Sequence, residues 1–136
     1  MAMYDLAQYH AVRGDTRNSL PLLTTAIEKN SFYFYLSGKE INFNPLRREV
    51  IQLQEEMKKK AKTDALSVIS SAEKNLKDVE KRFDQLHVVK EKNKISTHLK
   101  LALEKASSGN YKSIVESKTI AMFVFDSIAA SKDQVP

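Results

Sequence analysis

Apolar residues recur every three or four positions along most of the chain, which is the spacing of one face of an α-helix. The first stripe comprises Met3, Leu6, Ala7, His10 and Ala11, and the second comprises Leu20, Leu23, Ala26 and Ile27. Gly14 lies between them and suits the left-handed backbone that often ends a helix. Asp15 or Thr16 can cap the next helix by accepting a backbone N–H, and Pro21 falls near its first turn. The pattern predicts a helical hairpin.

The residues of this hairpin, YDLAQYHAVRGDTRNSLPLLTTAIEKN, also resemble one tetratricopeptide repeat. The matching positions are Leu6, Ala7, Gly14, Ser19, Leu23 and Ala26. In that family the small residues, here Ala7, Ser19 and Ala26, allow two helices to approach closely. The sequence departs from the family pattern at His10, which replaces an aromatic, and at Ser31, which stands where Pro often ends the repeat. Such repeats occur in arrays of three or more, so the resemblance implies the last repeat of a longer array and a chain that is a fragment.

Between Pro45 and Gly109 the sequence contains neither Gly nor Pro, which predicts long helices. The apolar positions there are Leu46, Val50, Leu53, Met57, Ala61, Ala65, Ile69, Ala72, Leu76, Val79, Phe83 and Leu86. From Ile69 onward they alternate steps of three and four, as in a coiled-coil seam. Two steps of four before Ala65 leave two alternatives open. Residues 46–87 form one helix, or two helices that meet near residue 62.

Two further stripes follow a turn predicted at His87-Val88-Val89. The first comprises Ile95, Leu99, Ala102, Leu103 and Ala106, and the second comprises Tyr111, Ile114, Val115, Lys118, Ala121, Met122, Phe125 and Ile128. Gly109 separates them. Phe123 and Val124 widen the apolar arc of the second stripe, so we expect this helix to be covered on more than one side. The prediction is an all-α fold, with a tetratricopeptide-like hairpin and capping segment at 1–45 and an antiparallel bundle of long helices at 46–136.

The stretch SFYFYLSGKEINFNPLR concentrates the aromatic residues of the chain. Its rings are Phe32, Tyr33, Phe34, Tyr35 and Phe43. They can stack on nucleobases, or they can plug the end of a hydrophobic core. Residues 30–38 contain no basic side chain, whereas a base-stacking platform needs cations between its rings. We therefore expect at least three of the five rings to be largely buried.

Composition narrows the range of functions. The 136 residues include no Cys, which excludes disulfides, thiolate catalysis and Cys-based zinc sites. No apolar stretch reaches membrane-spanning length, and the first residues lack a signal-peptide pattern. His10, His87 and His98 do not have the spacing of metal ligands, and no glycine-rich phosphate loop or nucleophile elbow is present. We expect a cytoplasmic protein that is not an enzyme and holds no cofactor or metal.

Two functions remain for such a chain. The first is a non-catalytic interaction or scaffolding module that binds another protein or another copy of itself. Its candidate contact residues are Met3, Leu6 and His10, which upstream repeats would cover. The alternative is a nucleic-acid or anionic-surface binder, because the net charge is +5. Its candidate residues are Lys58, Lys59, Lys60, Lys62, Lys74, Lys77, Lys81 and Arg82.

Overall fold

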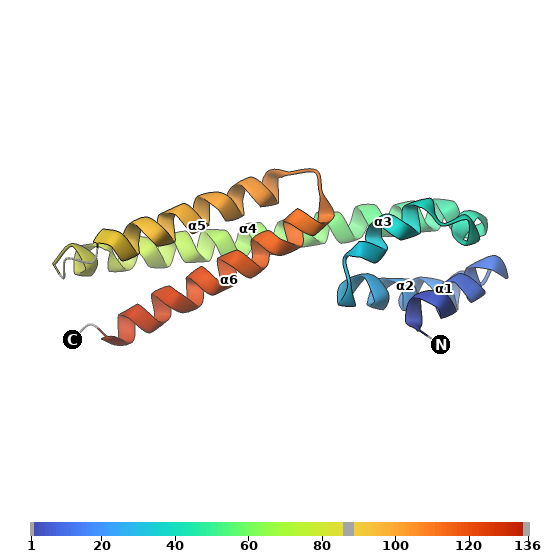
Figure 1. Ribbon diagram of the computed structural model, residues 1–136, viewed down its shortest axis with the longest axis horizontal. Helices are drawn as coiled ribbons and strands as arrows, with labels where there is room; N and C mark the ends of the chain where they lie inside the picture. Colours follow the sequence, from blue (N-terminus) through green and yellow to red (C-terminus); the bar gives the residue numbers. More distant parts are fainter. Residues whose placement is uncertain (1, 86–88, 135–136) are drawn as a thin grey trace. The chain divides into compact units, whose positions relative to one another are not determined.

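The computed structural model describes residues 2–85 and 89–134, and all regular structure in these ranges is helical. The elements are α1 (Met3–Val12), α2 (Thr16–Lys29), α3 (Phe32–Lys39), the 3-10 helix η1 (Ile41–Leu46), α4 (Arg47–Gln85), α5 (Val89–Ser107) and α6 (Tyr111–Gln134). Figure 1 shows them in chain order from blue to red. The predicted all-α fold class is confirmed.

The chain divides into two compact units, residues 1–59 and 60–136. This boundary falls inside α4, later than the boundary predicted at residue 45. The first turns of α4 belong to the first unit because their side chains pack there. Val50 is fully buried, and the Gln54 side-chain amide donates to the Phe34 carbonyl oxygen over 2.8 Å.

The predicted hairpin is confirmed as α1 and α2. Gly14 takes a positive φ of 73° between the two helices, and the Asp15 side chain accepts from the Asn18 backbone N–H to cap α2. The Ser19 hydroxyl donates to the Ala7 carbonyl oxygen over 2.7 Å, which requires the two backbones to lie close together. Pro21 lies in the second turn of α2, one turn later than predicted.

Side chains from the start of α4 hold the C-terminal end of α3. The Arg47 guanidinium donates to the carbonyl oxygens of Ser37 and Glu40, at 2.8 and 2.6 Å. A helix leaves its last carbonyl groups without partners inside the helix, and Arg47 supplies donors for two such groups. The Gln54 amide also reaches the Ser37 hydroxyl at 3.1 Å. These bonds tie α3 to the start of α4.

The second unit contains the remainder of α4 together with α5 and α6 (Figure 1). One core cluster comprises Ala72, Leu76, Ile95, Leu99, Val124 and Ile128. The other comprises Ala65, Ile69, Ala102, Ala106, Ile114 and Ala121. Each cluster takes residues from all three helices. Asn110 caps α6, since its side-chain oxygen accepts from the Ser113 backbone N–H.

The structure settles the open question about the long helix and corrects part of the predicted stripes. Residues 47–85 form one helix. In α6 the buried positions include Ser117 and Val124, whereas Val115, Met122 and Phe125 are exposed. Leu103 of α5 is exposed as well. Of the turn predicted at His87-Val88-Val89, the first two residues lie outside the described residues and Val89 begins α5. The side chains of Val79, Phe83 and Leu86 also lie outside the described residues.

Candidate functional site

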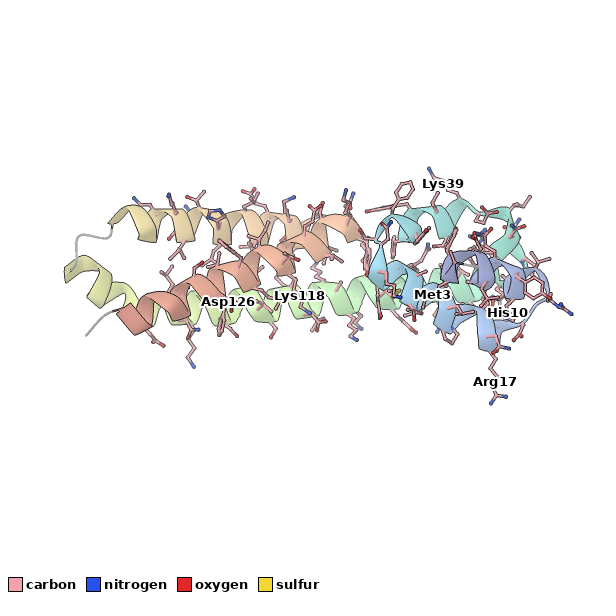
Figure 2. The ribbon with its side chains drawn as sticks, turned by 60° about the horizontal axis from the view of Figure 1, so that its bottom comes forward. Met3, His10, Arg17, Lys39, Lys118 and Asp126 are labelled. Carbon is pink, nitrogen blue, oxygen red and sulfur yellow. The ribbon has the colours of Figure 1, made fainter. Side chains whose placement is uncertain are left out.

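The outer face of α1 carries the three predicted contact residues. Tyr4, Ala7 and Ala11 form the buried face of this helix. Met3 lies beside that face and is 38% exposed, while Leu6 and His10 are half-buried. Met3 and His10 both lie on α1 in Figure 2. Positions 3, 6 and 10 follow the spacing of one helix face, so the structure keeps the three residues on one side of α1.

Two further apolar residues on α1 were missed by the sequence analysis. Tyr9 is 49% exposed and Val12 is 57% exposed. The Arg13 guanidinium lies over the Tyr9 ring, with its central carbon 5.2 Å from the ring centroid, and donates to the Tyr9 hydroxyl. The sequence could have identified both residues, because they are apolar but do not fall on the predicted buried stripe. We call Met3, Leu6, Tyr9, His10 and Val12 the α1 outer face.

A hollow of about 430 Å³ lies next to this face. It is lined by Asp5, Gln8, Tyr9, Val12 and Arg13 of α1 and by Asn42 of η1. The Asn42 side-chain amide donates to the Gln8 side-chain oxygen over 2.9 Å, so two of its polar lining residues already pair with each other. The hollow has the size of a ligand pocket, but only Tyr9 and Val12 supply apolar lining.

His10 of the α1 outer face contacts the carboxylate of Asp15. The His10 Nδ1 lies 3.5 Å from the Asp15 carboxylate. Two hydrogen bonds from Asn18, one from its side chain and one from its backbone, hold the pKa of Asp15 below its usual value, and the charges of His10 and Arg13 act in the same direction. Because the carboxylate stays ionised and caps α2, it serves the fold rather than proton transfer.

The aromatic run contributes to a core cluster centred on Tyr4. The Tyr4 and Tyr33 rings stack with centroids 4.3 Å apart, and the Phe43 ring lies 5.8 Å from Tyr4. Burial, reinforced by the nearby charges of Glu40, Tyr33 and Asp5, raises the pKa of Tyr4 to about 12, and Arg47 opposes this rise. This arrangement favours core plugging over a stacking platform.

The burial predicted for the five rings is met only in part. Phe43 is fully buried, Tyr33, Phe34 and Tyr35 are half-buried, and Phe32 is exposed. Phe32 is the first residue of α3, and the sequence spacing alone did not show which of four consecutive rings would face outward.

The structure does not gather the predicted basic residues on one face. Lys58, Lys59, Lys60 and Lys62 occupy nearly successive positions of α4, which point about 100° apart around a helix. Lys74 and Lys77 are exposed further along α4. The side chains of Lys81 and Arg82 lie outside the described residues. The lysines therefore spread around the helix and form no single stripe.

His98 is the other histidine whose surroundings are described. Its Nδ1 lies 2.7 Å from the Lys94 carbonyl oxygen on its own helix, and its ring lies 6.5 Å from that of Phe123. His87 lies outside the described residues. Where the structure is described, no three His, Asp or Glu side chains converge as metal ligands.

Comparisons with known proteins add no family. The chain matches no protein-family model, no curated protein and no solved structure. The tetratricopeptide resemblance therefore stays a prediction. None of the helices in the described ranges combines the length and the apolar character needed to cross a membrane.

Proposed function

We propose that the chain is a non-catalytic protein–protein interaction module that binds a partner helix along the α1 outer face. The observation that carries this proposal is the exposure of Met3, Tyr9 and Val12 on a ten-residue helix whose opposite side is already packed in the core. Single exposed apolar residues are common on protein surfaces, but several on one short helix indicate a contact surface.

The chemistry of the α1 outer face defines the partner. An amphipathic helix that packs against α1 would cover Tyr9 and Val12, which lie three residues apart on neighbouring turns, with its own apolar positions. The adjacent hollow would receive one of its side chains, and Asp5 and Arg13 would supply charges of both signs at the rim. Such a helix would belong to a separate protein.

The test is to identify the partner and then measure its affinity for variants of the α1 outer face. A photo-crosslinking residue at Tyr9 captures the partner, and binding is then reconstituted with both purified proteins. We expect Val12→Glu to weaken binding at least about tenfold, which corresponds to about 1.4 kcal/mol. Arg17→Glu is the matched control, because Arg17 is exposed on α2 (Figure 2) and is not part of this face. Equal affinities for both variants would refute the proposal.

The alternative, a nucleic-acid or anionic-surface binder, predicts a different result. Its affinity for an oligonucleotide should fall steeply as salt rises, and replacing Lys59, Lys60 and Lys62 by Gln should weaken it. Tight, salt-sensitive binding that Val12→Glu leaves unchanged would favour this alternative over a protein partner.

A further inference from the structure

The side of α6 that faces away from the core includes two exposed apolar residues, unlike the corresponding side of its neighbours. The core face of α6 comprises Ile114, Ser117, Ala121, Val124 and Ile128, all buried. The opposite side carries Lys112, Val115, Thr119, Phe123 and Asp126, all exposed. We call these five residues the α6 outer stripe. Val115 is 37% exposed and Phe123 is 65% exposed, and Met122 beside them is 49% exposed.

The other two helices of the second unit provide an internal comparison. Opposite its core residues, α4 presents Thr63, Ser67, Ser70 and Lys74, and α5 presents Asn93, Thr97, Lys100 and Glu104. All eight are polar and exposed, which is the normal pattern for a helix with one face in water. Only α6 of the three places a Val and a Phe at these outermost positions, so its outer stripe is more apolar than the corresponding positions of α4 and α5.

The spacing of the α6 outer stripe is symmetric. Its steps along the sequence are three, four, four and three, centred on Thr119. When two copies of such a stripe pair antiparallel about a two-fold axis at Thr119, Lys112 of one copy lies level with Asp126 of the other. Val115 lies level with Phe123, and each Thr119 meets its equivalent. The charges at both ends are therefore complementary to a second copy of the same stripe.

Thr119, at the centre of the α6 outer stripe, can be buried against a second helix without losing a hydrogen bond. The Thr119 hydroxyl already donates to the Val115 carbonyl oxygen of its own helix, at 3.4 Å. Burying Thr119 therefore leaves no unpaired hydroxyl. A parallel pairing would instead place Lys112 against Lys112 and Asp126 against Asp126, and like charges at these positions disfavour it.

We propose that the occupant of the α6 outer stripe is a second copy of this chain, in a two-fold symmetric dimer with antiparallel α6 helices. An interface of this kind uses the same patch on both subunits and closes on itself. It is separate from the α1 outer face, so the two proposals stand or fall independently.

The first experiment measures the oligomeric state of the full chain by sedimentation equilibrium. We expect a concentration-dependent dimer whose dissociation constant rises at least about tenfold in Phe123→Ser. Two controls should leave the dimer intact. Leu66→Ser removes an exposed apolar side chain from α4, and Val12→Glu alters only the α1 outer face. A monomer at all concentrations, or a dimer that Val12→Glu abolishes and Phe123→Ser does not, would overturn the proposal.

The second experiment tests the antiparallel geometry through charge reversal. Asp126→Lys alone brings a new positive charge level with Lys112 of the other copy and should weaken the dimer. The double variant Lys112→Asp with Asp126→Lys exchanges the two charges and should restore it. A double variant as weak as the single one would rule out this pairing.

The third experiment locates the two-fold axis. The chain contains no Cys, so Thr119→Cys introduces a single thiol. We expect mild oxidation to join two copies through this position, because the introduced thiol of one copy would lie next to that of the other. Thr97→Cys, on the outer face of α5, is the control and should remain monomeric on a non-reducing gel. Equal crosslinking of both variants would contradict an axis at Thr119.

Discussion

At the scale of single residues, Tyr4 has the most unusual environment in the first unit. Its ring packs between Tyr33 and Phe43, yet its hydroxyl is buried and lacks a hydrogen-bond partner among the described residues. Tyr4 was not predicted to belong to the first stripe, because Met3 and Leu6 fit the helical spacing equally well. Only the position of the aromatic segment against α1 decides which phase of the helix is buried.

We predict that Tyr4→Phe will not lower the free energy of unfolding. The substitution keeps the ring contacts and removes a buried hydroxyl without a partner, a change that is neutral or stabilising. Phe43→Ala should instead cost about 3–5 kcal/mol, through lost apolar burial and the cavity left behind. Urea unfolding of the two variants and the parent chain checks both values. A loss of more than about 1 kcal/mol in Tyr4→Phe would show that the hydroxyl makes a stabilising contact.

The raised pKa of Tyr4 predicts a loss of stability in alkali. Burial raises this pKa to about 12, above the value of about 10 that the residue has in an unfolded chain. Above about pH 10 the Tyr4 hydroxyl loses its proton in the unfolded state but keeps it in the folded state. The contribution of Tyr4 to the free energy of unfolding therefore falls as the pH rises toward 12. Urea unfolding at about pH 9 and about pH 11 provides the measurement. Between these pH values the free energy of unfolding should fall less for Tyr4→Phe than for the parent chain. Equal losses would contradict the raised pKa.

At the scale of elements, α3 depends on contacts from residues later in the chain. Arg47 holds its last carbonyl groups and also donates to the Asn44 side-chain oxygen over 2.9 Å. Gln54 adds bonds to Phe34 and Ser37. Local sequence gives this eight-residue helix little support, since an isolated helix of that length is unstable in water.

We predict that Arg47→Met will lower the free energy of unfolding by about 1–3 kcal/mol, because partly buried carbonyl groups lose their donors. Arg47→Lys should recover only part of this loss, since an ammonium group cannot reproduce the planar fork of the guanidinium. Arg48→Met is the control, because Arg48 is the neighbouring exposed residue. Equal free energies of unfolding for Arg47→Met and Arg48→Met would show that Arg47 does not stabilise α3.

The elements also show what the sequence could predict. The hairpin of α1 and α2 was predictable because Gly14, Asp15 and Ser19 act over short sequence distances. The phase of α6 was not, since Val115 and Met122 fit an apolar stripe as well as Ser117 and Val124 do. Met3, Leu6 and His10 stay predicted contact residues, whereas the exposed Tyr9 and Val12 were not singled out because a stripe describes only the buried face.

At the scale of the whole molecule, the boundary between the two compact units falls within α4. Both core clusters of the second unit draw all their residues from positions after 60. The first unit likewise completes its core with residues before 60, including Val50. Long-range packing set this boundary, so the uniform helical pattern around residues 46–62 could not reveal it.

We predict that residues 60–136 expressed alone will fold into a helical unit with a cooperative thermal transition. The reason is that both clusters are complete within this segment. Circular dichroism during heating provides the measurement, and the double variant Ile69→Ser with Ile114→Ser is the control that should abolish cooperativity. A non-cooperative melt of the unaltered segment would show that the second unit depends on the first.

The small residues between the helices of the second unit have a consequence for how this sequence can diverge. Ala65, Ala72, Ala102, Ala106 and Ala121 are fully buried where the helices meet. A larger side chain there would push two backbones apart, whereas exchange among large apolar residues such as Ile and Leu is tolerated better. Selection would therefore preserve side-chain volume at these five sites more strictly than hydrophobic character. Related sequences should be recognisable by the spacing of small residues, even where their larger core residues have been exchanged.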